Sequence, residues 1–138
     1  MTLLVLDTNV ALDLLVFDDP SCMSLRAVID AGTFEWIATQ AMRDELVRVL
    51  GYPLIVPRLE RGGRDAAQVL AAFDARVRLV DTPATASLPC EDADDQMFVD
   101  LAVAHRAQLI SKDRAVLVMQ KRLALLGVTV VPAFDATA

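Results

Sequence analysis

Residues that commonly bind transition metals or form disulfides are scarce in this chain of 138 residues, which has two cysteines and one histidine. Cys22 and Cys90 are isolated thiols without a Cys-x-x-Cys spacing, so they indicate neither a disulfide framework nor a thiolate metal site. His105 lies on the apolar face of a predicted helix and is expected to pack there or at an interface. Zinc is therefore disfavoured as a cofactor, because its usual nitrogen and sulfur ligands are not clustered.

Long apolar runs are also absent, although 55% of the residues are hydrophobic and the mean hydropathy is +0.44. No uninterrupted run approaches the ~18 residues that a membrane-spanning helix requires, so no membrane association is expected. Asp7 follows the initiator methionine too closely for the apolar segment of a signal peptide, which predicts a cytoplasmic protein. The apolar surplus favours an interface with a second copy or a partner, with a generous core as the alternative.

Positive charge is in short supply as well, since the formal net charge is -6 and the isoelectric point is near 4.6. This balance argues against a protein that binds nucleic acid through bulk positive charge. That argument does not apply to an acidic site that holds a cation, because the cation can contact the nucleic acid. Arg58, Arg61 and Arg64 are candidates for local phosphate binding, with a solvated charged loop as the alternative.

Strand-like and helix-like apolar patterns alternate along the whole chain, which we expect to form one domain over residues 1–138. Strands are predicted at residues 3–6, 34–38, 77–80, 108–111 and 128–132, and those at 3–6 and 108–111 are expected to be buried. Helices are predicted at residues 8–15, 21–31, 39–50, 65–75, 96–106 and 113–126, with Ser21 capping the second helix and residues 52–63 irregular. This alternation predicts a doubly wound parallel α/β sheet flanked by helices.

Carboxylates follow two of the predicted strands at the point where each strand ends. The apolar run Leu3–Leu6 ends in Asp7, and the strand 108–111 ends in Ser111 with Asp113 close behind. Ligands of open parallel sheets bind in the crevice at the carboxyl ends of the strands, so both aspartates are site candidates. Each aspartate could instead be only the N-cap of the helix that follows it.

Glu45 is a third candidate and lies on the predicted helix 39–50. It borders the apolar stripe that contains Met42 and Leu46, whereas Asp44 lies nearly opposite that stripe. A boundary glutamate is usually a surface residue with a packed stem. Glu45 is therefore a candidate for the site only in combination with the other acidic residues.

The densest acidic stretch is Glu91–Asp95, which has four acids in five residues directly before the helix 96–106. Asp94 and Asp95 flank the centre of the apolar face of that helix, so two carboxylates are expected to approach the core side. Asp92 or Asp94 would serve as the helix N-cap. One cap explains one aspartate and leaves the others without a structural reason.

A single sheet can gather carboxylates from these distant segments at one edge, namely Asp7, Glu45, Asp95 (with Asp94) and Asp113. Such a group would repel itself strongly without a hard divalent cation, and oxygen-only ligands are what Mg²⁺ or Mn²⁺ prefers. A cation of this kind holds a phosphodiester and lowers the pKa of an attacking water. The resulting hypothesis is metal-assisted phosphodiester hydrolysis.

Several motifs, taken in order along the chain, resemble the PIN-domain ribonucleases, and most closely the toxins of bacterial toxin–antitoxin pairs. They are Leu6-Asp7-Thr8-Asn9-Val10, Glu45, Asp92-x-Asp94-Asp95-x-x-Phe98 with Leu101-Ala102, and Ser111-Lys112-Asp113. Ala93 departs from the proline that related sequences commonly carry. The resemblance implies a PIN-like fold and a Mg²⁺- or Mn²⁺-dependent endoribonuclease that acts on RNA. It also implies a homodimer and a cognate antitoxin protein as the inhibitor.

The same resemblance implies roles for individual residues. The four acidic positions of the family fall on Asp7, Glu45, Asp95 and Asp113, and the metal ligands among them are Asp7, Asp95 and Asp113. Asp7 and Asp95 are expected to be the principal ligands, with Glu45 or Asp113 ordering the attacking water. The supporting positions fall on Asn9, Ser111, Asp92 and Asp94. Asp95 is preferred as the ligand from the acidic loop because it lies one helical turn before Phe98, as in the family's motif.

Two other classes of protein fit parts of the pattern. Haloacid-dehalogenase-like phosphatases also place an aspartate after a strand, but their second acid is replaced here by Asn9 and no separate lysine motif is evident. A catalytically silent interaction domain would use the acids as helix caps and as solubilising charge. The presence of all four candidate acids argues against that second alternative.

Overall fold

Residues 2–135, which the computed structural model describes, contain five strands in one sheet. The strands are β1 (Thr2–Leu6), β2 (Phe34–Ala38), β3 (Val77–Leu79), β4 (Gln108–Ile110) and β5 (Thr129–Val131). Every neighbouring pair is parallel, and the spatial order is β3-β2-β1-β4-β5. The chain winds outward from β1 to β3 and then crosses back to β4 and β5. This topology confirms the predicted doubly wound sheet.

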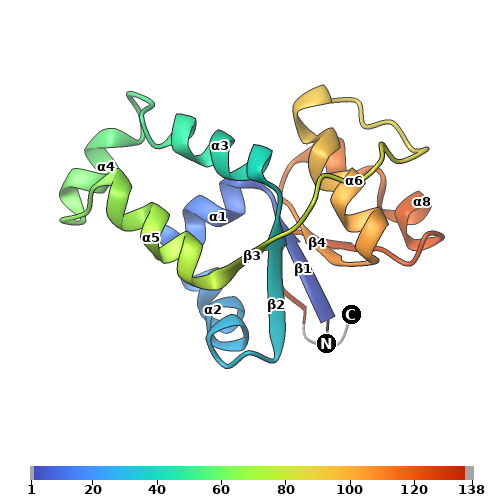
Figure 1. Ribbon diagram of the computed structural model, residues 1–138, viewed down its shortest axis with the longest axis horizontal. Coiled ribbons are helices and arrows are strands. Elements are labelled where there is room, and N and C mark those ends of the chain that lie inside the picture. Colours follow the sequence, from blue (N-terminus) through green and yellow to red (C-terminus); the bar gives the residue numbers. More distant parts are fainter. Residues whose placement is uncertain (1, 136–138) are drawn as a thin grey trace.

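Helices flank this sheet on both sides (Figure 1). They are α1 (Thr8–Leu15), η1 (Pro20–Cys22), α2 (Met23–Asp30), α3 (Gln40–Val49), α4 (Val56–Arg61), α5 (Ala66–Arg76), η2 (Ala93–Asp95), α6 (Gln96–His105), α7 (Arg114–Leu117) and α8 (Gln120–Ala124). Figure 1 shows α1, α2 and α5 on one side of β1 and β2, and α6 on the other. No helix within residues 2–135 is long and apolar enough to cross a membrane.

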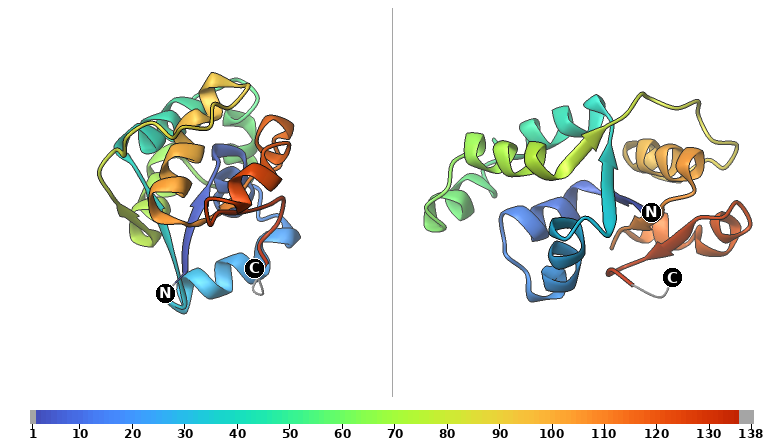
Figure 2. Two further views of the ribbon diagram at one scale, coloured as in Figure 1. Left: turned by 90° about the vertical axis from the view of Figure 1, so that its right-hand side faces the viewer. Right: turned by 60° about the horizontal axis from the view of Figure 1, so that its bottom comes forward.

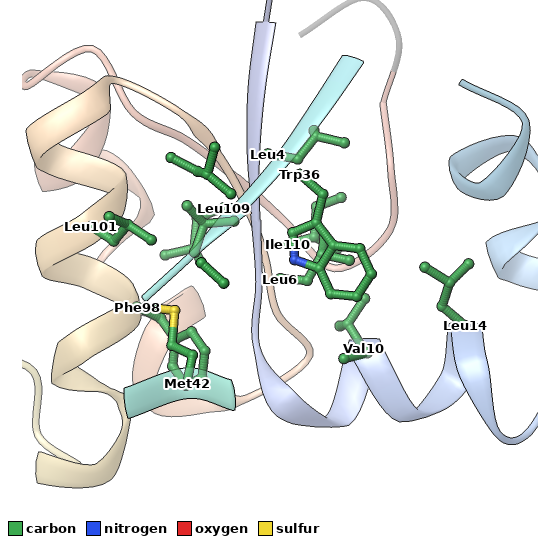
Figure 3. Packing of buried hydrophobic residues seen from close by; sticks show 14 of the residues in the cluster. Leu4, Leu6, Val10, Leu14, Trp36, Met42, Phe98, Leu101, Leu109 and Ile110 are labelled. Atoms are coloured by element: carbon green, nitrogen blue, oxygen red, sulfur yellow. The ribbon is translucent and has the colours of Figure 1, made fainter. Parts of the chain in front are cut away.

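The central strand β1 is buried on both faces because helices pack against it from both sides. Its last three residues are each at most 3% exposed. Figure 3 shows Val10 and Leu14 of α1 on one side of β1, and Phe98 and Leu101 of α6 on the other. Truncating a buried side chain of this kind to alanine costs about 2–5 kcal/mol. The core therefore holds the end of β1, and the residue that follows it, firmly in place.

The stretch 52–63 is not irregular throughout, because it contains the helix α4. Pro57 lies in the first turn of α4, where a missing N–H removes no hydrogen bond within the helix, so this proline opens a helix instead of breaking one. Leu59 anchors the helix to the core and is 4% exposed. The prediction that residues 52–63 are irregular is therefore wrong for the residues of α4.

The prediction that Ser21 caps the second helix is also wrong. Asp19 begins this segment, because its Oδ1 accepts hydrogen bonds from the Ser21 backbone N–H at 2.9 Å and from the Ser21 hydroxyl at 2.8 Å. Ser21 lies inside η1, which Pro20 opens and which continues into α2. The hydroxyl of Ser21 thus donates to the cap and does not serve as one.

The helix predicted from Asp113 to Leu126 is divided into α7 and α8. The N–H of Met119 donates to the carbonyl oxygen of Val116 at 3.0 Å, one residue nearer along the chain than in an α-helix. The tight turn bends the chain so that Val116, Met119 and Leu123 are all at most 1% exposed. Burial of all three side chains thus overrides the tendency to continue one helix.

Candidate active site at the carboxyl ends of β1 and β4

Asp7 follows β1 directly and is 4% exposed. Its Oδ1 accepts a hydrogen bond from the Val10 N–H at 2.9 Å, so Asp7 is the N-cap of α1. Its Oδ2 accepts a hydrogen bond from the hydroxyl of Ser111, which follows β4. The helix cap therefore accounts for one carboxylate oxygen of Asp7, and the second oxygen faces the neighbouring strand.

Ser111 joins the two aspartates that follow strands. It is fully buried, and its hydroxyl both donates to Asp7 and accepts a hydrogen bond from the Asp113 N–H at 3.1 Å. Asp113 in turn accepts a hydrogen bond from the Ala115 N–H at 2.9 Å and caps α7. Both aspartates lie where the winding direction of the sheet reverses, which is the usual ligand-binding position of such sheets.

The turn that carries Asp113 is also tied to α1 by an ion pair. Lys112 donates a hydrogen bond from its ammonium group to Oδ2 of Asp13, whose side chain is 11% exposed. Sequence reasoning missed this pair, although the lysine between Ser111 and Asp113 is a visible signal. The pair fixes the β4–α7 turn relative to the helix that Asp7 caps.

The segment between β3 and the short 3₁₀ helix η2 forms no strand or helix, and the acidic loop lies at its end, just before α6 (Figure 2). Oδ1 of Asp100 accepts hydrogen bonds from the Ala86 N–H and from the Gln96 side-chain amide, both at 2.8 Å. The side-chain oxygen of Gln96 accepts a hydrogen bond from the Cys90 N–H at 2.6 Å. Asp100 therefore positions the acidic loop, and sequence reasoning missed this role.

Asp92, Asp94 and Asp95 occupy different environments within this loop. Asp92 caps η2, because its side chain accepts a hydrogen bond from the Asp94 N–H at 2.9 Å. The side chain of Asp94 is exposed, whereas Asp95 is half-buried. Oδ2 of Asp95 is buried and has no hydrogen-bond partner among residues 2–135. Asp95 is thus the aspartate of this loop that has an uncompensated buried oxygen.

Burial and neighbouring charge make two of these carboxylates costly to ionise. Burial, the contact with the side chain of Asp113, and the negative charges of Asp113, Asp92 and Asp7 together raise the pKa of Asp95 to about 7. Burial also raises the pKa of Asp7, although hydrogen bonds from Ser111 and Val10 act against the increase. A bound cation would remove this cost by favouring the ionised forms.

The donor set fits a divalent cation. One carboxylate oxygen from each of Asp92, Asp95 and Asp113 lies within 4.8 Å of the other two. The set contains oxygen ligands only, and it includes the side chain whose buried Oδ2 lacks a partner. Hard cations with open water positions suit such a group. Asp92 is therefore a member of the cluster, in addition to its predicted role as a helix cap.

Glu45 approaches the same place from α3, together with two residues of α1. Thr8 donates a hydrogen bond from its hydroxyl to Oε2 of Glu45 at 2.6 Å. Asp7, Thr8, Asn9, Glu45 and Asp95 line one cavity of about 280 Å³. Glu45 is half-buried and Asp44 is exposed, as the helical wheel predicts. Sequence reasoning missed Thr8, although its hydroxyl follows Asp7 in the first helical turn.

The three arginines proposed to bind phosphate are not among the residues that line this cavity. The guanidinium of Arg58 lies over the ring of Phe17, 4.2 Å from the ring centroid, and Arg61 donates to the carbonyl oxygen of its neighbour Pro57 at 3.4 Å. Arg64 donates to two backbone carbonyl oxygens at the end of α1, each at 2.9 Å. Arg58 and Arg61 are exposed, whereas Arg64 is half-buried and contributes to the packing of α1.

The fold and the site together define a class of protein, namely a doubly wound α/β domain with a carboxylate cluster suited to a divalent cation. A family model described as PIN domain matches residues 3–115, from β1 to the start of α7, and the chain belongs to the PIN-domain family. No curated protein matches the chain. Family membership supports a nuclease fold and leaves the haloacid-dehalogenase alternative without support.

Proposed function

We propose that this protein is a Mg²⁺- or Mn²⁺-dependent endoribonuclease that hydrolyses RNA phosphodiester bonds. The observation that carries this proposal is the cluster of Asp92, Asp95 and Asp113, in which Asp95 has a buried, unpartnered oxygen. Asp7 lies beside this cluster, because Ser111 links it to Asp113. Helix capping alone leaves the Asp95 oxygen unexplained, whereas cation binding requires such an acceptor. Membership of the PIN-domain family supports the same reaction class.

The carboxylates have separate roles in this proposal. Asp7, Asp95 and Asp113 would hold the cation, with Asp92 close enough to contribute. When bound, the cation neutralises charge on the phosphate and lowers the pKa of the attacking water. Glu45 or Asp113 accepts a hydrogen bond from that water and orients it toward phosphorus.

Two supporting residues keep these carboxylates in position. Ser111 fixes Asp7 relative to the backbone of Asp113, because its hydroxyl donates to Asp7 and accepts a hydrogen bond from the Asp113 N–H. Thr8 orients Glu45 by donating to Oε2, and Asn9 lines the cavity beside them. Residues held by packing and hydrogen bonds in this way lose little orientational freedom when substrate binds.

The biological setting is part of the same proposal. We infer that the whole chain, residues 1–138, acts as one nuclease domain, in the cytoplasm, as the toxin of a toxin–antitoxin pair. The resemblance in the acidic motifs supports this role, together with a cognate antitoxin protein as the inhibitor. Exposed apolar side chains such as Leu125, which is 86% exposed, support a homodimer. Light scattering that gives the 15.0 kDa monomer mass well above micromolar concentration would contradict the dimer.

RNA binding in this acidic protein requires local positive charge. Arg58 and Arg61 are exposed on α4 and are the proposed phosphate contacts, with Arg64 beside them. Replacing all three by alanine should weaken RNA binding and reduce its dependence on salt. If RNA affinity and its salt dependence were both unchanged, these arginines would have structural roles only.

The direct test compares carboxylate variants on the same RNA. Asp7→Asn and Asp95→Asn should each abolish cleavage in Mg²⁺ or Mn²⁺ and weaken Mn²⁺ binding measured by calorimetry. Asp44→Asn is the matched control, because Asp44 is exposed and lies next to Glu45 on α3. Cleavage at the parent rate by both site variants would favour the catalytically silent interaction domain.

A further inference from the structure

The cavity that contains the carboxylates has a second, uncharged half. Leu12, Val49, Tyr52, Leu54, Ile55 and Phe98 line it beside Asp7, Glu45 and Asp95. Most of these side chains come from the end of α3 and from the turn that leads into α4. The metal and phosphate chemistry proposed above uses the acidic half and leaves the apolar half without a role.

Two of these apolar residues are exposed to an extent that folding does not explain. Tyr52 is 47% exposed and Leu54 is 86% exposed, although both line the cavity. Tyr52 is the chain's single tyrosine, and its ring is therefore the one phenol available to any ligand. Exposed aromatic and aliphatic side chains beside a charged site are typical of a binding surface.

The backbone holds this surface in a fixed arrangement. The N–H of Tyr52 donates to the carbonyl oxygen of Val49 at 3.0 Å. The carbonyl oxygen of Tyr52 accepts hydrogen bonds from the N–H groups of Ile55 at 2.9 Å and Val56 at 3.0 Å. Pro53 restricts the backbone between them. The ring of Tyr52 is thus presented by a preorganised turn, which lowers the entropy lost on binding a flat ligand.

We propose that the apolar half of the cavity is a subsite for one nucleobase of an unpaired nucleotide, and that Tyr52 is its stacking platform. This inference rests on the proposed function and deepens it by assigning the apolar half of the cavity to one base of the substrate. The acidic half accepts the phosphate with its cation, and the uncharged half accepts the base. A base inside a duplex is already stacked and cannot reach such a wall without being extruded.

The subsite is tested by removing either the ring or the base. Cleavage of a single-stranded RNA oligonucleotide is mapped first, and an abasic nucleotide is then placed on each side of the mapped bond. Tyr52→Ala should lower kcat/KM for the parent oligonucleotide by roughly 10-fold, as expected for one base–aromatic stack. The same variant should change kcat/KM little for the abasic oligonucleotide that already lacks the stacked base.

Three controls separate stacking from other roles of Tyr52. Tyr52→Phe keeps the ring and should retain the parent rate, and Mn²⁺ binding by Tyr52→Ala should equal that of the parent. Leu54→Ala should lower kcat/KM less than Tyr52→Ala does. Leu125→Ala is the matched control for Leu54→Ala, because both leucines are 86% exposed and Leu125 does not line the cavity.

Binding without turnover makes the subsite testable even if the proposed cleavage reaction is wrong. A fluorescein-labelled RNA single strand is titrated with Asp7→Asn and with Asp7→Asn/Tyr52→Ala, and anisotropy gives both affinities. Weaker binding by the double variant, and no comparable binding of the annealed duplex by Asp7→Asn, supports the subsite. Equal affinities, equal loss on parent and abasic RNA, or equal cleavage of duplex would overturn it. The proposal would also be overturned if Tyr52→Ala altered only the mass of the oligomer and left RNA binding and cleavage unchanged. That result would indicate that Tyr52 lies in a protein interface.

Discussion

The two ends of helix α1 both carry charged side chains, and they differ in how those charges are compensated. At the N-terminal end, Asp7 lies near Asp95 and Asp113, and burial and like charge raise the pKa of Asp95 to about 7. At the C-terminal end, Asp18 pairs with Arg64 and with Arg26, and hydrogen bonds from these guanidinium groups lower the pKa of Asp18.

The paired end has a clear structural purpose. Arg64 donates to the carbonyl oxygens of Leu15 and Val16, each at 2.9 Å, and Arg26 donates to that of Leu14. These carbonyls have no partner within the helix, and cations suit the negative end of the helix dipole. Opposite charges at one end of α1 therefore complete the fold, whereas like charges at the other end oppose it. Uncompensated like charge is the feature that marks the site for a ligand.

The largest contrast should appear when one aspartate is neutralised at the unpaired end. Asp7→Asn should lower RNA cleavage by roughly two orders of magnitude or more, because a preorganised charge is lost. Its thermal stability in the presence of a chelator should hold or rise, because repulsion and desolvation are relieved. Calorimetric scans and a cleavage assay measure the two effects. A large loss of stability without metal would show that Asp7 acts mainly as a cap.

The dependence of stability on pH should separate the two ends next. Asp95 has a folded pKa above its unfolded value, so the folded protein binds the extra proton between about pH 4 and about pH 7. Metal-free stability contributed by this group should therefore fall as pH rises through that window. Asp18 has the opposite sign, because its folded pKa is lowered and its contribution is lost on acidification.

Thermal scans of the metal-free protein across that window measure this pH effect. Asp95→Asn should flatten the decrease, and saturating Mn²⁺ at the upper end should restore stability, since it binds the ionised carboxylates. Asp44→Asn should leave the profile unchanged, because Asp44 is exposed and outside the cavity. A profile that Asp95→Asn does not alter would contradict the raised pKa.

A smaller effect is expected from the ion pair that bridges the site to α1. Lys112→Ala should destabilise the protein by about 1–3 kcal/mol, because it leaves the buried carboxylate of Asp13 without its cation. Mn²⁺ affinity should fall as well, since the β4–α7 turn that carries Asp113 is loosened. Urea denaturation and calorimetry provide the two measurements. Lys121→Ala, on α8, is the control lysine, and unaltered stability and affinity in Lys112→Ala would refute the bridging role.

The smallest effects should come from the paired end. Arg64→Ala should cost about 1–2 kcal/mol, because it removes the hydrogen bonds to two carbonyl oxygens and to Asp18. Arg61→Ala should cost under about 0.5 kcal/mol, because Arg61 is exposed and makes one long hydrogen bond. Urea denaturation compares the two variants. Equal effects would mean that Arg64 does not stabilise the end of α1.

Several parts of the site could be predicted because they depend on chain direction alone. Asp7 and Ser111 follow strands that pair in parallel, so their side chains had to meet at one edge once the sheet formed. The place of Glu45 at the border of the core follows from the angular spacing of its own helix. These features are local, or depend on a topology that the strand–helix alternation already predicts.

Other features depended on contacts between segments that the sequence does not place together. The three aspartates of the acidic loop differ because Asp100 and Gln96 hold the loop in one conformation, which buries Asp95 and leaves Asp94 exposed. The side chain of Arg64 lies against α1, where it donates hydrogen bonds to the last carbonyl oxygens, which have no donor within the helix. The sequence by itself determined which carboxylates reach the end of the sheet, since strand direction and helical periodicity are properties of each segment. The tertiary structure decided which of them remain uncompensated, because burial and pairing exist only after distant segments pack.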